Sequence, residues 1–82
     1  MAIRNNAEVR YEIKKHYGTI STNDQASYKK ELNLVSWNGG QEKFDIRDWN
    51  SDHSRMTKGI TLTREEAQEL LNLLDAALND EE

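Results

Sequence analysis

Residues 28–49 restrict the possible folds of this 82-residue chain more than any other segment. Two stretches of alternating apolar and polar residues flank the sequence Asn-Gly-Gly at 38–40, and such alternation is typical of β-strands. Asparagine and glycine readily adopt the positive backbone φ angles that a tight hairpin turn requires. We therefore predict two antiparallel strands, over 28–37 and 42–49, joined by this turn.

The two faces of the predicted hairpin differ in chemistry, because successive side chains of a strand point to opposite faces. One face is apolar and holds Leu32, Leu34, Phe44 and Ile46. The other combines basic residues with tryptophans, namely Lys29, Trp37, Lys43, Arg47 and Trp49. Basic groups attract phosphates, and an exposed indole offers a base a surface on which to stack. This face is predicted to bind unpaired nucleic acid.

The segments on either side of the hairpin favour two further strands. Residues 9–14 alternate apolar and charged side chains and indicate a strand that runs to about Ser21, although their Glu, Lys and Arg would also suit a short helix. Turn-forming and polar residues predict loops over 22–27 and 50–56. A short fourth strand is expected over 58–62.

The start of a helix is the clearest local signal. Thr63 and Glu66 have the spacing of a capping box, in which each side chain bonds the backbone amide of the other residue. We predict a helix over 64–78 with one apolar stripe, formed by Ala67, Leu70, Leu71, Leu74 and Leu78 and widened by Leu73 and Ala77. The predicted fold class is α+β: a four-stranded antiparallel sheet and one C-terminal helix that covers its apolar face. The stripe is wide enough to contact a second partner as well.

Length and composition exclude several classes of protein. A chain of 82 residues is at most one domain, which we assign to residues 1–82. The absence of cysteine rules out disulfides and thiolate metal sites. No apolar run is long enough to span a membrane, and the N-terminus has no apolar signal-peptide core. We expect a soluble, cytoplasmic protein.

The net charge of −4 argues against nucleic acid until its distribution is considered. Residues 65–82 hold seven of the 15 acidic residues and none of the 11 Lys and Arg residues. Residues 1–64 therefore set 11 basic residues against eight acidic ones and carry about +3. A polyanion responds to this local potential and not to the sum over the chain.

Each candidate binding residue also has a simpler interpretation. Trp37 and Trp49 could pack in a second small core or a dimer contact, because tryptophan is usually largely buried. Arg47 could form a plain ion pair with Asp45, worth about 0–1 kcal/mol at a surface. The cations near the last loop are either solvated or a basic rim; they are Arg55, Lys58 and Arg64.

Catalysis has little support in the sequence. The two histidines, His16 and His53, are far apart. The acidic residues around His53 match no known pattern of metal ligands, and the glycines at 39–40 belong to a hairpin and not to a phosphate-binding loop. We predict a protein that is not an enzyme and needs no cofactor.

Three segments together resemble one known family. They are Glu42 to Trp49, with its Asp-Ile-Arg core, Met56 to Thr63, with its Lys-Gly-Ile-Thr-Leu sequence, and the Leu-rich helix. The pattern is similar to that of the transcriptional positive cofactor 4 family. The sequence of residues 31–39 resembles the bacterial YdbC-type branch of this family. The resemblance spans about residues 28–78.

The resemblance implies a homodimer whose curved sheets bind single-stranded DNA through backbone charges and stacking aromatics. By position, the DNA-contacting arginine of the family corresponds to Arg47, its aromatics to Trp37 and Trp49, and its Lys-Gly-Ile lysine to Lys58. Roles in transcription, replication or repair, partner proteins in those processes and association with the nucleoid are implied in the same way.

This chain departs from the family in the hairpin, where members often carry lysines and this sequence has residues 38–41, Asn-Gly-Gly-Gln. Lys43 lies just beyond and replaces part of that charge. We predict a homodimer that binds single-stranded DNA with little sequence preference, with Lys29, Lys43, Arg47, Arg55 and Lys58 on the backbone. Two alternatives stay open: binding of single-stranded RNA, and a protein-interaction module that uses the tryptophan face.

Overall fold

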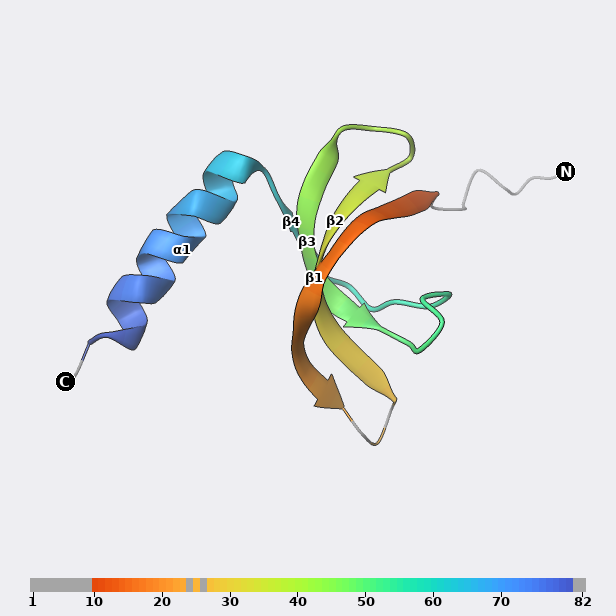
Figure 1. Cartoon of the computed structure of the whole chain (residues 1–82), viewed down its shortest axis with the longest axis horizontal. Helices are drawn as coiled ribbons and strands as arrows, with labels where there is room; N and C mark the ends of the chain where they lie inside the picture. The colour runs from red at the N-terminus through yellow and green to blue at the C-terminus, as the bar shows by residue number, and fades with distance from the viewer. Residues whose placement is uncertain (1–9, 24, 26, 81–82) are drawn as a thin grey trace, which may run out of the picture.

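The computed structural model of the chain describes residues 10–23, 25 and 27–80. These residues form one antiparallel sheet in the order β1-β2-β3-β4, followed by one helix (Figure 1). The elements are β1 (Tyr11–Asn23), β2 (Tyr28–Trp37), β3 (Glu42–Trp49), β4 (Ile60–Leu62) and α1 (Arg64–Leu78). The predicted α+β class, with four strands and one C-terminal helix, is confirmed.

Three of the five elements have the predicted bounds, and two differ. β2, β3 and α1 match, because a turn or a capping box marks their ends in the sequence. β1 continues two residues beyond the predicted end at Ser21, and β4 begins only at Ile60. Residues 11–14 are strand, so the alternative of a short helix there is wrong. The predicted start at Val9 lies outside the described residues.

The hairpin turn between β2 and β3 forms as predicted. Asn38 and Gly39 have φ angles of 54° and 75°, and the amide of Gly40 donates to the carbonyl of Trp37 at 2.8 Å. Positive φ at both central residues is the geometry that matches the twist of two antiparallel strands. Asn38 also accepts a hydrogen bond from the amide of Arg10, 3.0 Å away, through its side-chain oxygen. The turn therefore also holds the start of β1.

β1 follows the curve of the sheet through three register shifts, between Ile13 and Lys15, His16 and Gly18, and Thr19 and Ser21. A bulge inserts an extra residue, bends the strand and exchanges the faces of the residues beyond it. The result is a long edge strand that arches together with the sheet (Figure 1). Simple alternation along β1 consequently fails to predict which of its side chains share a face.

The best-buried side chains lie inside the arch and not on the leucine face. We call the inner side the concave face; in β2 and β3 it holds Glu31, Asn33, Val35, Trp37, Lys43, Asp45, Arg47 and Trp49. Of the hydrophobic side chains in the described part of the chain, Val35 and Trp49 are buried. The opposite convex face, with Leu34 and Phe44, is half-buried. The apolar face of the predicted hairpin is therefore not the most deeply buried face of the single chain.

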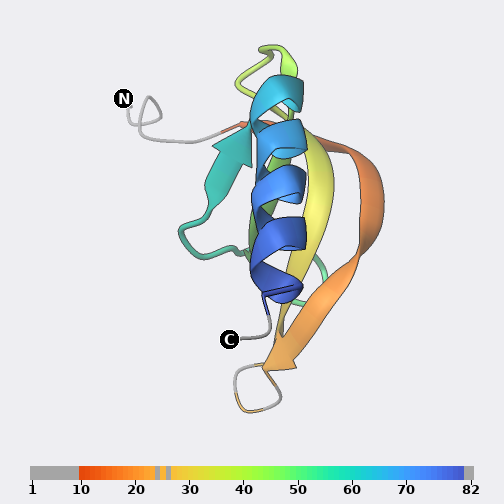
Figure 2. The same cartoon turned by 90° about the vertical axis from the view of Figure 1, so that its left-hand side faces the viewer.

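Helix α1 does not cover the sheet, contrary to our prediction. Its capping box is present, with Glu66 N donating to Thr63 Oγ1 and Thr63 N donating to Glu66 Oε1. The helix then runs apart from the sheet (Figures 1 and 2), and an open pocket of about 760 Å³ lies between its first turn and the hairpin end of β2 and β3. None of its side chains is buried, and Leu74 is 47% exposed. No described helix is long and apolar enough to cross a membrane.

Candidate nucleic-acid interface

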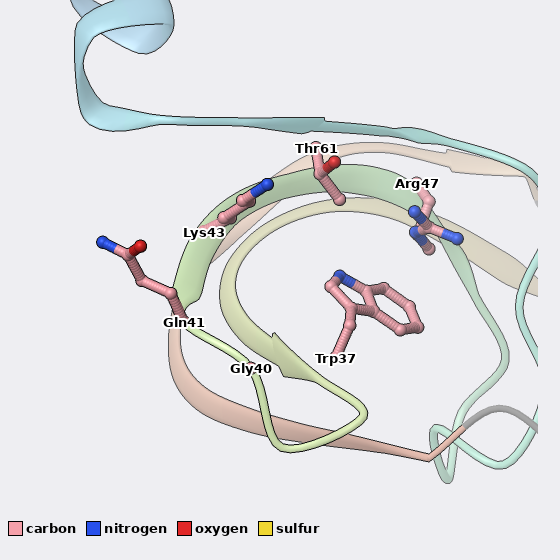
Figure 3. Close-up of a pocket in the computed structure, with 6 residues that line it drawn as sticks. All are labelled: Trp37, Gly40, Gln41, Lys43, Arg47 and Thr61. Atoms are coloured by element: carbon pink, nitrogen blue, oxygen red, sulfur yellow. The ribbon is translucent and has the colours of Figure 1, made fainter.

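A pocket of about 410 Å³ opens on the concave face next to the hairpin turn. Its lining combines an indole, two cations and small polar groups, from Trp37, Gly40, Gln41, Lys43, Arg47 and Thr61. Figure 3 shows Trp37 inside the arch of the strands, with Lys43 and Arg47 on two sides of it and Gln41 pointing away. The structure thus brings together three of the predicted site residues: Trp37, Lys43 and Arg47.

Trp37 is half-buried and is held by its neighbours on two strands. The guanidinium carbon of Arg47 lies 4.6 Å from the centroid of its indole ring. Tyr11, its register partner on β1, lies 5.8 Å away between ring centroids. The indole Nε1 is buried and has no hydrogen-bond partner within the described residues. Trp37 is therefore a fixed aromatic surface at the rim of the pocket, of the kind on which bases stack.

Arg47 is paired and not free. Its Nε donates to Oδ1 of Asp45 at 2.7 Å, and its Nη1 donates to the carbonyl of Thr57 at 3.3 Å. The Asp45 side chain is fully buried, and that of Arg47 is 13% exposed. The simpler interpretation of Arg47 as an ion-pair partner thus describes its main contact in the structure.

Trp49 lies 1% exposed at the far end of β3, unlike the exposed stacking residue that the sequence predicted. Its ring packs against Tyr11, at 5.2 Å between centroids, and against His53, at 5.5 Å. Met56 pairs with it through an isolated β-bridge. A side chain enclosed in this way offers no open face to a base. Trp49 instead packs beneath Tyr11 in the interior of the sheet.

A buried polar network lies beside this aromatic cluster. Glu31 accepts a hydrogen bond from Asn33 Nδ2 at 3.1 Å, and its Oε1 lies 2.9 Å from His53 Nε2 and 3.6 Å from His16 Nδ1. Burial by itself raises the pKa of Glu31. The hydrogen bonds from Asn33 and His53, together with the electrostatic influence of His53 and His16, outweigh burial and hold the pKa of Glu31 below its ordinary value.

The loop between β3 and β4 is fixed by its own hydrogen bonds. Asn50 accepts from the amide of Arg55 through its side chain, and Asp52 accepts from the amide and hydroxyl of Ser54. His53 has a φ of 61°, a left-handed conformation that histidine adopts more readily than most residues. The described residues contain no group of three or more His, Cys, Asp or Glu that could hold a metal.

The remaining predicted cations do not line the pocket. Lys29 is in register with Trp49 at the end opposite the pocket, Arg55 lies on the loop, and Lys58 precedes β4. All three are exposed, as is Lys43. None of the four takes part in an ion pair with any residue that the structure describes, whereas Lys30, on the convex side, pairs with Asp48 at 2.9 Å.

Sequence reasoning missed two contributors to this face, Tyr11 and the pair formed by His53 and Glu31. Tyr11 contacts both tryptophans, and its hydroxyl donates to the carbonyl of His53. Its place in an alternating segment marked it as a strand residue. The strand register, which puts it opposite Trp37, leaves no local trace in the sequence.

Comparison with known proteins assigns the chain to a family. Residues 25–73, more than half of the chain, match the family described as Transcriptional Coactivator p15 (PC4). The chain belongs to the PC4 family. A protein of Treponema pallidum (strain Nichols), described only as uncharacterized, is 45% identical over 71 residues, which are 87% of this chain and 82% of that protein. The PC4 match covers β2, β3, β4 and most of α1.

Proposed function

We propose that this PC4-family protein binds single-stranded DNA, with little sequence preference, on the concave face of its sheet. The observation that carries the proposal is the half-buried indole of Trp37 beside the unpaired cation Lys43 at a pocket of about 410 Å³. Stacking on an indole accepts any base, because every base has a π-face. The proposal also agrees with the family, which is a nucleic-acid-binding one, and nothing in the described residues points to catalysis.

Lys29, Lys43, Arg55 and Lys58 are the proposed phosphate contacts. Each is exposed and has no acidic partner within the described residues, so it can exchange its counterions for a phosphate. The acidic residues of this face are instead buried beneath it, with Glu31 paired to histidines and Asp45 to Arg47. The surface that single-stranded DNA would contact therefore carries a more positive charge than the chain as a whole.

The protein is proposed to act as a homodimer, with α1 in the interface. Leu71, Leu74 and Leu78 are 59%, 47% and 80% exposed in the single chain. An apolar patch of this kind marks an interaction surface, because exposed leucines lose the favourable free energy of burial. Pairing with a second copy would bury the stripe.

The biological role proposed is regulation of transcription as a coactivator, with replication or repair as further processes that use single strands. The family description supports the first of these. Proteins of the transcription or repair machinery are the corresponding partners.

Fluorescence titration with oligo-dT at two salt concentrations tests the proposal. Binding should quench tryptophan emission and weaken at higher salt, while a duplex of the same length binds less tightly. Equal affinity for oligo-U would extend the activity to RNA. Absence of oligonucleotide binding at low salt would reject it, and the tryptophan face would then be tested as a protein-interaction surface, whose affinity changes little with salt.

Light scattering tests the dimer. Leu74→Glu should yield monomers, because it places a charge in the apolar stripe. Ala76→Glu adds the same charge on the opposite side of α1 and should leave the dimer intact. A wild-type chain that stays monomeric at micromolar concentration would reject the homodimer without affecting the proposal of DNA binding.

A further inference from the structure

Arg47 is held by four residues from three segments of the chain. Asp45, two residues earlier in β3, accepts from Nε at 2.7 Å, and the carbonyl of Thr57 accepts from Nη1 at 3.3 Å. Met56 Sδ lies 3.7 Å from the same Nη1. The fourth contact is the indole of Trp37, 4.6 Å from the guanidinium carbon. These contacts use the two features that distinguish arginine from lysine, its forked donors and its flat stacking surface.

The backbone at Gly59 closes the same site from the other side. A Cβ atom at this position would collide with Cβ of Arg47 and with the carbonyl oxygen of Ile46, so the chain passes directly against the arginine. Together with the hydrogen bond to Thr57, this contact fixes the direction of the Arg47 side chain. The guanidinium is thereby held against one face of the indole.

The charge of Arg47 is already balanced. Its partner Asp45 is fully buried and forms its recorded ion pair with this arginine. An arginine and a carboxylate at 2.7 Å add no net charge to the surface, so the pair contributes little to attracting a phosphate. Lys43, on the same face and exposed, carries no such partner among the described residues.

From these contacts we propose that Arg47 is a positioning residue: it holds the indole of Trp37 at the pocket and is not a phosphate contact. This inference rests on the proposed binding of single-stranded DNA. It changes the role that the family resemblance implies for Arg47. It also assigns the phosphate contacts of the pocket to Lys43.

Three variants separate positioning from phosphate binding in an oligo-dT titration over a range of salt. Arg47→Lys and Arg47→Met should both weaken binding about tenfold or more, because neither side chain can hold the indole. The slope of log affinity against log salt should stay unchanged in both. Lys43→Met should reduce the magnitude of that slope by about 0.7, the value of one phosphate contact on a single strand.

The opposite pattern would overturn the inference. If Arg47→Lys keeps the affinity of the wild type while Arg47→Met loses affinity and about 0.7 of slope, Arg47 binds phosphate through its charge. Should Arg47→Met fail to fold, the lysine variant, which keeps a cation above Asp45, still distinguishes the two roles.

A spectroscopic measurement on the free protein needs no DNA. The indole N–H resonance of Trp37 is the one that disappears in Trp37→Phe. Arg47→Lys should shift this resonance and leave that of Trp49 in place, whereas Lys43→Met should move neither. An unmoved Trp37 resonance would overturn the positioning role. A chain that binds no oligonucleotide but shows the shift would instead reject the proposed function alone.

Discussion

His53 Nε2 lies 2.9 Å from Oε1 of Glu31, a carboxylate that the sheet buries. The pair ties the loop between β3 and β4 to the middle of β2, a contact that spans 22 residues of sequence. The carbonyl of His53 also accepts the hydroxyl of Tyr11, so one residue joins the loop to two strands. Glu31 and Tyr11 therefore hold the loop against the sheet through His53.

Stability should decrease in acid through Glu31. Its pKa in the folded protein lies below the ordinary value of about 4.3, so the folded state binds the proton less readily than the unfolded chain does. The stabilisation is complete above the ordinary pKa and is lost as the pH falls through the lowered one. Glu31→Gln should remove this pH dependence and lower the free energy of unfolding at neutral pH by about 1–3 kcal/mol. Urea denaturation between pH 3 and 7 measures both effects.

The control for this prediction is Glu42→Gln, an exposed glutamate at the start of β3. It should leave the stability curve as it is in the wild type. A Glu31→Gln protein with the acid sensitivity of the wild type would show that other groups cause it.

Trp37→Ala should weaken oligo-dT binding by about 1–3 kcal/mol, the cost of losing one stacked base, while the protein stays folded. The side chain is half-buried at the rim of the pocket, so its loss leaves the buried Trp49 and its contacts in place. Tyr17→Ala is the matched control, because Tyr17 is 45% exposed and contacts Phe44 on the convex face. Unchanged affinity for Trp37→Ala, or an equal loss for Tyr17→Ala, would contradict stacking on the concave face.

Trp49→Ala should act on stability. Removing a large buried aromatic typically costs about 3–5 kcal/mol, and here it also takes away the support of Tyr11 and His53. Thermal unfolding followed by circular dichroism measures the loss. A variant as stable as the wild type that fails to bind oligo-dT would show instead that Trp49 contacts the bases directly.

The unpaired lysines should set the salt dependence of binding. Lys29→Gln and Lys43→Gln are each expected to reduce the slope of log affinity against log salt by about 0.7. Lys30→Gln is the control next to Lys29 in sequence, since Lys30 lies on the other side of the strand and already pairs with Asp48. If the Lys30 variant changed the slope as much as the other two, the bound DNA would not follow the concave face.

Local sequence signals correctly predicted the elements whose ends are defined by a turn or a helix cap. Asn38 and Gly39 specify the hairpin because few residues tolerate positive φ, and Thr63 with Glu66 specifies the first turn of α1. The alternation on β2 and β3 also placed Trp37, Lys43 and Arg47 on one face, as the register confirms. Family membership was equally accessible, because the motifs that carry it can be read from the order of residues without knowing their contacts.

The sequence by itself determined the existence of the strands, the turn and the helix, since each depends on residues within a few positions of one another, and its motifs also determined the family of this protein. Only the tertiary structure decided which face is buried, that Arg47 is paired with Asp45 and that Trp49 is enclosed. Alternation defines two faces of a strand but not which one lies inside a curved sheet. That choice depends on the three register shifts of β1 and on the contacts of Tyr11 and His53, which bring together residues far apart in the chain.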